Sequence, residues 1–471
     1  MYATSRVRWL ALIVLCLGNL MIVLDTTIVN VALPSIRQSL GFSETSLAWV
    51  VNAYLLTFGG FLLLGGRLGD LYGHRRLFLT GLSVFTVASI ICGLAGSQGL
   101  LIAARAAQGL GAAVVSAVAL SLMMTLFTEQ AERAKAMGVF GFVMAGGGSL
   151  GVLLGGILTS AFDWHWIFLV NAPIGVLVYL LSLKLLSGTH NPAGLPHLDV
   201  GGAITVTLAT LLAVYAIVNG NVAGWLSAQT LGLLAVSAVL LASFLRHETI
   251  AKAPLMPLDL FRRRNIAVSN AVAILWAAAM FAWFFISALY LQLVLHYTPL
   301  QVGLAFLPAN LIMAAFSFGL SARLVMRFGI KKPLAIGLAI ATLGLLWLTQ
   351  APVDGRFVAH VLPGMLLLGL GAGMAFNPVL LAAMSDVPPH ESGLASGLVN
   401  TSFMMGGALG LAILASLAAA RTTELTAHGI NPASALMGGY QAAFLAGAAC
   451  AALAAAVGAW LLRIKPQPAN S

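Results

Sequence analysis

Charged side chains are scarce in this chain: they make up 8% of its 471 residues, whereas hydrophobic residues make up 60%. Because a typical soluble domain is about 25% charged, this composition excludes a water-soluble globule. Cysteine is also scarce, with three in all, and each lies inside an apolar run. A disulfide framework or a metal centre is therefore not expected, and we interpret Cys16, Cys92 and Cys450 as small packing residues.

Long apolar runs recur along the whole sequence. About 20 such residues cross the hydrocarbon core of a bilayer as a helix. The runs show no alternation of polar and apolar residues, and lipid offers no partner to free backbone groups, so they predict helices rather than a barrel. We therefore predict an all-α polytopic membrane protein with fourteen transmembrane helices, near 9–33, 47–66, 77–96, 100–124, 136–158, 166–186, 200–219, 230–246, 267–294, 302–322, 333–350, 358–382, 394–418 and 440–462.

The net charge of +10 raises the question of nucleic-acid binding, but the positions of the basic residues argue against it. Basic residues alternate by loop. If the N-terminus is inside, most of them fall in cytoplasmic segments, and the outer segments hold only Arg37, Arg356 and Arg421. This asymmetry follows the positive-inside rule. It predicts cytoplasmic N and C termini and a multi-pass protein of the cytoplasmic (inner) membrane, with lipid and not nucleic acid as its surroundings.

The sequence also repeats itself. GRLGDLYGHRRLF at 66–78 aligns with ARLVMRFGIKKPL at 322–334. Further along, one acidic residue and three glycines recur at a constant offset: Glu132, Gly138, Gly147 and Gly151, and then Glu391, Gly397, Gly406 and Gly410. Two homologous six-helix halves explain this pattern. The resulting prediction is an N-terminal half at 1–190, a two-helix insertion at 191–255 and a C-terminal half at 256–471.

Asp25 is the one carboxylate that we place at membrane depth, where an ionisable group costs roughly 2.5–3.5 kcal/mol on insertion scales. Gly18, Asn19, Thr26 and Asn30 fall on the same helix face. A polar stripe on an apolar helix is expected to face the bundle interior or a water-filled cavity, so Asn19, Thr26 and Asn30 are candidates to line a substrate cavity. The alternative is a structural aspartate that bonds its Asn and Thr neighbours.

Arg105 is the one basic residue that we place inside a span, closer to the outer boundary than Asp25. An arginine that reaches inward would cover much of the gap to Asp25. We therefore predict that Asp25 and Arg105 carry proton coupling. The alternative is an arginine that extends outward to the lipid headgroups.

A polar loop follows the second predicted span. Its aspartate, tight turn and basic cluster are suited to bridging two helix ends in one conformation and releasing them in another. A simple charged anchor with a turn is the alternative. The predicted gating residues are Gly66, Arg67, Asp70, Gly73, Arg75 and Arg76.

Glycines are spaced along the fifth predicted span so that they open a helix face to close backbone approach; they are Gly138, Gly147, Gly151, Gly155 and Gly156. GGGSLG at 146–151 also fits a dinucleotide-binding pattern, but no strand precedes it, so we discard that interpretation. Helix packing without a further function is the alternative.

These segments together resemble the major facilitator superfamily, and within it the fourteen-span drug:proton antiporters of the EmrB/QacA type. The resemblance covers essentially the whole chain. It rests on LDTTIVNVALP at 24–34, the loop at 66–76, RAAQGLGAA at 105–113, the glycines of the fifth span and WHWIFLVNAPIG at 164–175. It implies alternating access between two six-helix halves, with the inserted helices outside the transport path.

Some positions depart from the family pattern. Val152 replaces the usual proline after the third glycine, and Leu71 replaces the basic residue after the loop aspartate. In the second half, Met326 and Met365 stand where Asp70 and Arg105 would recur. The coupling residues are therefore expected mainly in the first half.

The resulting prediction is a proton-coupled antiporter that exports hydrophobic, cationic drugs or toxic compounds; the alternative is a proton-coupled transporter of one specific metabolite. We find no catalytic constellation at membrane depth and expect neither an enzyme nor a cofactor. A periplasmic adaptor protein is an expected partner if the source is a bacterium with two membranes. Further candidates for the substrate cavity, each of which plain helix packing would also explain, are Trp49, Tyr54, Trp276, Phe284, Phe285, Met404 and Met405.

Overall fold

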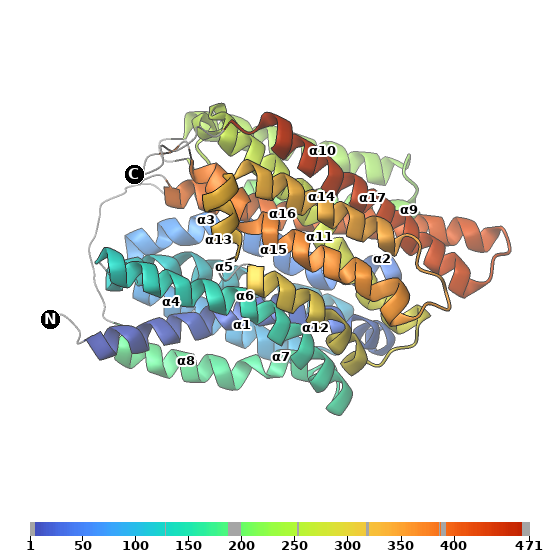
Figure 1. The fold of residues 1–471 in the computed structure, drawn as a ribbon, viewed down its shortest axis with the longest axis horizontal. Helices are drawn as coiled ribbons and strands as arrows, with labels where there is room; N and C mark the ends of the chain where they lie inside the picture. The colour runs from blue at the N-terminus through green and yellow to red at the C-terminus, as the bar shows by residue number, and fades with distance from the viewer. Residues whose placement is uncertain are drawn as a thin grey trace. The chain divides into compact units, whose positions relative to one another are not determined.

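Long helices make up the protein. The computed structural model describes residues 5–127, 129–186, 199–251, 254–316, 320–385, 387 and 392–463, and this part of the chain contains helices and no strand. The chain divides into two compact units. Unit 1 comprises Met1–Met256 and Phe284–Leu307, and unit 2 comprises Pro257–Trp283 and Pro308–Ser471. Figure 1 shows that the long helices within each unit run in broadly similar directions.

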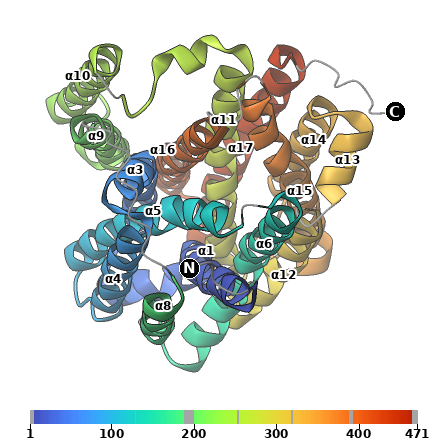
Figure 2. The same ribbon diagram turned by 90° about the vertical axis from the view of Figure 1, so that its left-hand side faces the viewer.

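Unit 1 is built around α5. This helix packs between α3 and α4, while α1 packs against α5, α6 and α8 (Figure 2). The pair α9 and α10 lies beside α3. The helices of this unit are α1 (Ser5–Leu40), α2 (Glu44–Leu47), α3 (Trp49–Tyr72), α4 (His74–Gly93), α5 (Gln98–Leu126), α6 (Gln130–Ala161), α7 (Trp166–Leu169), α8 (Asn171–Leu185), α9 (Val200–Ala223) and α10 (Ala228–Ile250).

Two further helices are shared between the units. Unit 1 contains the end of α11 (Arg264–Leu289), a π-helical turn at Tyr290–Val294 and the start of α12 (Pro299–Ala315). Unit 2 contains the rest of both helices. In unit 2, α14 packs against α15 and α17, and α16 packs against α17. The other elements of this unit are a 3-10 turn (Leu258–Arg262), α13 (Ser321–Phe328), α14 (Lys331–Leu348), a π-helical turn (Phe357–Val361), α15 (Leu362–Met384), α16 (Ser392–Ala427) and α17 (Pro432–Leu461).

Local sequence signals set several helix ends. Ser97 caps α5 by accepting a hydrogen bond from the Leu100 amide, which satisfies one of the free donors at a helix start. Asn431 caps α17, and Pro432 follows at the first helical position, where its missing N–H costs nothing. Gly73 ends α3 and begins α4 at φ 90°, a conformation that side-chain-bearing residues rarely adopt.

Among the described residues, twelve helices are long and apolar enough to cross a membrane. Two expected spans, at 136–158 and 302–322, are not among these twelve. They coincide with shorter apolar stretches: Leu150–Ala161, which is the end of α6, and Pro299–Ala315, which is α12. The count of fourteen therefore stays a prediction. Several helices extend past the expected boundaries. Among them, α10 continues to Ile250, past the expected end near 246, and its last turn contains Glu248.

The glycines of α6 allow close packing on α1. An ideal Cβ would lie 3.0 Å from the Leu20 side chain at Gly147, 2.8 Å from the Leu24 carbonyl oxygen at Gly151, and 2.6 Å from the Ile28 carbonyl oxygen at Gly155. Side chains at these positions would push the helices apart. The predicted single face is only partly correct, because Gly156 contacts Pro299 of α12 instead.

The glycine interface recurs in unit 2. Gly406 and Gly410 of α16 lie against Ile274 and Ala278 of α11, as Gly147 and Gly151 lie against α1. The repeated glycines in the sequence therefore serve equivalent helix contacts in the two units.

We predict that Gly111→Ala destabilises unit 1. An added Cβ would lie 2.5 Å from the Phe85 amide nitrogen and 2.8 Å from the Gly81 carbonyl oxygen, so α4 and α5 must separate at a cost of about 1–3 kcal/mol. Thermal melting of the purified protein should report a lower midpoint. Gly99→Ala in the same helix is the control, because nothing lies within 4 Å of its added Cβ. Equal midpoints for the two variants would contradict this packing.

Candidate functional site

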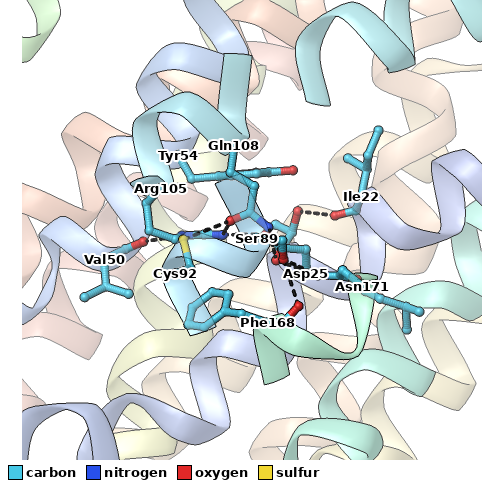
Figure 3. Close-up of polar contacts among 12 residues, drawn as sticks. Ile22, Asp25, Val50, Tyr54, Ser89, Cys92, Arg105, Gln108, Phe168 and Asn171 are labelled. Atoms are coloured by element: carbon cyan, nitrogen blue, oxygen red, sulfur yellow. Dashed lines mark hydrogen bonds and ion pairs between the residues drawn. The ribbon is translucent and has the colours of Figure 1, made fainter. Parts of the chain in front are cut away.

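Asp25 lies in α1 with its side chain fully buried, at 0% exposure. Its Oδ2 accepts a hydrogen bond from Nη1 of Arg105, which α5 contributes and which is 1% exposed. The sequence singled out these two residues separately, and the structure places them in one buried ion pair (Figure 3). Arg105 points inward and not toward the membrane surface.

Neutral polar side chains complete the site around the carboxylate. Oδ1 of Asp25 accepts hydrogen bonds from Gln108 Nε2 at 2.7 Å and Asn171 Nδ2 at 3.3 Å. These two amides also donate to the Ser89 hydroxyl, at 3.1 and 3.0 Å. Ser89 in turn donates to the Phe168 carbonyl oxygen at 2.9 Å. Both carboxylate oxygens therefore have donors, and the donors come from α5 and α8.

Arg105 has several partners besides Asp25. Its Nε donates to the Val50 carbonyl oxygen at 2.9 Å, and its Nη1 also donates to Gln108 Oε1 at 2.7 Å. Its guanidinium carbon lies 4.3 Å from the ring centre of Tyr54 and 5.6 Å from that of Phe168, within the range of a cation–π contact. These four partners are uncharged, so Asp25 is the charged one among the five.

Burial makes the partnership of the two charges obligatory. Taking each ion out of water costs several kcal/mol, which mutual attraction repays only when the remaining donors and acceptors are also satisfied. That condition is met at Asp25 and Arg105. Removing one partner of such a buried pair typically costs about 3–5 kcal/mol, so the ion pair couples the packing of α1 to that of α5.

The rest of the predicted polar stripe lies along α1 but does not join the ion pair. Asn19 is buried and accepts a hydrogen bond from Ser116 of α5 at 3.1 Å. Thr26 and Asn30 bond carbonyl groups of their own helix, Ile22 and Thr26 respectively. Asp25 is therefore the member of the stripe that joins the network with Arg105, Gln108 and Asn171.

Sequence reasoning missed Gln108, Asn171 and Ser89. A signal was present, because Gln108 lies one helical turn after Arg105 and Asn171 lies in the segment at 164–175 that carried the family resemblance. The sequence prediction considered mainly ionisable residues, so it did not include these uncharged side chains.

The residues of the predicted gating loop lie mostly in helices, which corrects the expectation of a loop: Gly66, Arg67 and Asp70 belong to α3, Arg75 and Arg76 belong to α4, and Gly73 alone separates the two helices. Gly73 forms the turn, and Arg75 Nη2 donates to the Leu183 carbonyl oxygen in α8 at 2.7 Å. Gly66 and Arg67 are half-buried and Arg76 is exposed. The side chain of Asp70 and the surroundings of Gly138 lie outside the described part of the structure.

The aromatic candidates in unit 1 are packed against neighbours. Trp49 lies 6.3 Å from Tyr215 of α9 between ring centres, and Tyr54 lies over Arg105. Phe284 stacks on Phe306 at 5.4 Å, and Phe285 is buried.

Unit 2 contains a small apolar pocket of about 10 Å³, roughly the room of one water molecule. Trp276 belongs to its lining, whereas Met404 and Met405 are half-buried elsewhere in α16. The lining residues are Ala273, Trp276, Phe376, Val379, Leu380, Val399, Asn400 and Phe403.

Long apolar helices whose glycine-mediated contacts recur in two units agree with the internal repeat that many transporter folds contain. Residues 15–411 match the Major Facilitator Superfamily, and the chain belongs to this family. It is a multi-pass membrane protein.

The chain is similar over most of its length to bacterial proteins whose names refer to resistance and export. It is 39% identical to the puromycin resistance protein pur8 of Streptomyces alboniger, over 97% of this chain and 91% of that protein. It is 38% identical to the cephamycin export protein CmcT of Amycolatopsis lactamdurans, over 89% of this chain and 87% of that protein. In fold it resembles a bacterial homologue of the human lysosomal transporter Spinster, with a TM-score of 0.69, 16% identity and coverage of 99% of this chain and 100% of that one.

We predict that Gln108→Leu lowers stability by about 1–3 kcal/mol, because it keeps the side-chain volume but removes a donor to Asp25 and an acceptor for Arg105. Thermal melting followed by tryptophan fluorescence measures the change. Gln229→Leu, at an exposed position in α10, is the matched control and should melt near the wild-type temperature. A Gln108→Leu midpoint equal to that of the control would mean that the network contributes little to folding.

Proposed function

We propose that the protein is a proton-coupled antiporter that exports hydrophobic, cationic drugs or toxic compounds by alternating access. The buried ion pair between Asp25 and Arg105 is the observation that carries this proposal. It offers a carboxylate that can take up a proton at a place where a change of charge alters helix packing.

The charge of the site gives the direction of coupling. With Asp25 ionised, Asp25 and Arg105 together are neutral. When Asp25 takes up a proton, the site carries one net positive charge, which disfavours a cation nearby in a medium of low dielectric. Proton binding and cationic substrate binding therefore oppose each other, as antiport requires.

Arg105 is suited to both states of Asp25. After protonation of Asp25, the guanidinium keeps the Val50 carbonyl, the Gln108 carbonyl and the Tyr54 ring as partners. A buried cation without any partner would be strongly destabilising, and these neutral groups remove that obstacle. The proton can thus come and go without leaving an unsolvated arginine behind.

The names of the relatives support export of a drug. The names of the two relatives described above refer to puromycin resistance and cephamycin export, and both compounds are antibiotics. Asp25 is fully buried in this conformation, so we propose that substrate reaches the neighbourhood of the pair only after the helices rearrange.

Topology belongs to the same proposal. We propose fourteen spans, with both termini in the cytoplasm and the protein in the cytoplasmic membrane. The distribution of arginine and lysine among the loops supports it, and so do the two shorter apolar helices beside the twelve long ones. A reporter that is active only in the cytoplasm, fused after Ser471, tests the side of the C-terminus.

We predict that Asp25→Asn abolishes uphill export while downhill movement of a neutral substrate is partly retained. Asparagine keeps the shape of the side chain but cannot exchange a proton. Proteoliposomes with an imposed pH gradient, assayed with a panel of cationic dyes, antibiotics and metabolites, measure both activities and also identify the substrate class.

Asp259→Asn is the control for this assay, because the Asp259 side chain is 87% exposed. Uphill transport by Asp25→Asn at an unchanged substrate-to-proton ratio would refute the assignment and direct attention to Asp70 and Glu132. Uphill transport of a single metabolite and of no drug would favour the metabolite transporter.

We predict that Asp70→Asn slows transport while leaving insertion and substrate binding largely intact. The reason is that Asp70 lies near the end of α3, just before the turn at Gly73 and the bond from Arg75 to α8, so its loss should affect the exchange between conformations. Transport rate and binding affinity are measured on the same preparation, with the exposed Asp354→Asn as control. Equal loss of binding and transport would indicate a collapsed fold instead.

A further inference from the structure

Two carboxyl groups meet where α9 begins and α10 ends. Asp199 precedes α9, and its Oδ1 accepts hydrogen bonds from the Gly202 amide at 2.7 Å and from His247 Nε2 at 2.9 Å. Glu248 lies in the last turn of α10, and its Oε2 accepts a hydrogen bond from the Met256 amide at 2.9 Å. Each carboxyl group therefore has one oxygen with donors.

The other two oxygens face each other. Asp199 Oδ2 and Glu248 Oε1 are buried, with no hydrogen-bond donor among the described residues, and they lie 2.4 and 2.8 Å from the position that a Cβ on Gly202 would occupy. The two carboxyl groups are close enough to share a hydrogen bond if one of them supplies the proton. An ionised carboxylate only accepts hydrogen bonds, so a bond between two carboxyl groups requires that one of them holds a proton.

The surroundings favour retention of this proton. Glu248 is 4% exposed and Asp199 is 9% exposed, and two negative charges this close in a buried site would repel strongly. Among the described residues, the charged groups on the neighbouring helices are His247, Arg246 and Arg67, of which His247 hydrogen-bonds the pair.

The contacts of the two acids distinguish their roles. Burial alone would raise the pKa of Asp199, but hydrogen bonds from the Gly202 amide, Glu248 and His247 outweigh burial and hold the pKa below its usual value. Asp199 is therefore the ionised partner. The proton resides on Oε1 of Glu248 and is donated to Oδ2 of Asp199.

We propose that Asp199 and Glu248 form a second proton-binding site, in which one shared proton clamps α9, α10 and the segment at Met256 together. Unit 2 begins at the next residue, Pro257, so the clamp holds the point where the chain leaves the inserted helix pair. Loss of the proton leaves two facing carboxylates, whose repulsion loosens these contacts.

Glu248→Gln tests the site, because its amide can donate to Asp199 permanently while its carbonyl oxygen accepts from Met256. Infrared difference spectra of the full-length protein between about pH 5 and about pH 9 should show loss of a protonated-carboxyl band in the wild type. That signal should be absent in Glu248→Gln and present in the exposed control Asp259→Asn. Persistence of the full signal in Glu248→Gln would overturn the proposal.

A second variant and a second measurement guard against misfolding. Asp199→Asn keeps the helix cap and can donate to an ionised Glu248, so the same band should be missing. The melting temperature of the wild type should fall by a few degrees at the higher pH, and this fall should be smaller in both variants. An equal fall in the wild type and both variants would also refute the clamp. Asp25→Asn should leave the band intact, so this result is independent of the proposed transport mechanism.

Discussion

The ion pair between Asp25 and Arg105 constrains how the helices of unit 1 are arranged. A buried charge must have an opposite charge and a full set of hydrogen bonds, and these partners come from several helices. Arg105 on α5 needs Val50 from α3 as well as Asp25 from α1. Asn171 from α8 completes the carboxylate. None of these helices can shift independently without breaking a bond in the membrane interior, where water cannot replace it.

Small residues make this arrangement sterically possible. Within the segment 105–113, Gly109 lies against the backbone of Tyr54 in α3, and Gly111 lies against the backbone of Phe85 in α4. The close approach of α3 allows Arg105 to reach the Val50 carbonyl oxygen, and that of α4 allows Gln108 to reach Ser89. The polar and the glycine positions of one motif therefore have a common purpose: the glycines set the helix distances at which the polar side chains meet.

Much of this was predictable from the sequence because the membrane restricts what a chain can do. Apolar runs predicted the helices, and the isolation of Asp25 and Arg105 among apolar residues identified both members of the ion pair. The uncharged members of the network were harder to find, since residues of the same type as Gln108 and Ser89 also pack in membrane helices without a special role. The predicted span at 230–246 ends before Glu248, because composition alone cannot tell whether the last polar turn of a helix is still helical and buried.

The two units share their packing but not their charges. Gly406 and Gly410 of α16 approach α11 as their counterparts in α6 approach α1, whereas Met365, buried in α15, stands where Arg105 would recur. An apolar side chain there makes no demand for a charged partner, so the position that corresponds to Arg105 needs no buried ion pair. If Asp25 takes up a proton, as we propose, the change of charge acts directly on the helix contacts of unit 1, and such an asymmetry would allow a single proton to favour one arrangement of a duplicated fold over another.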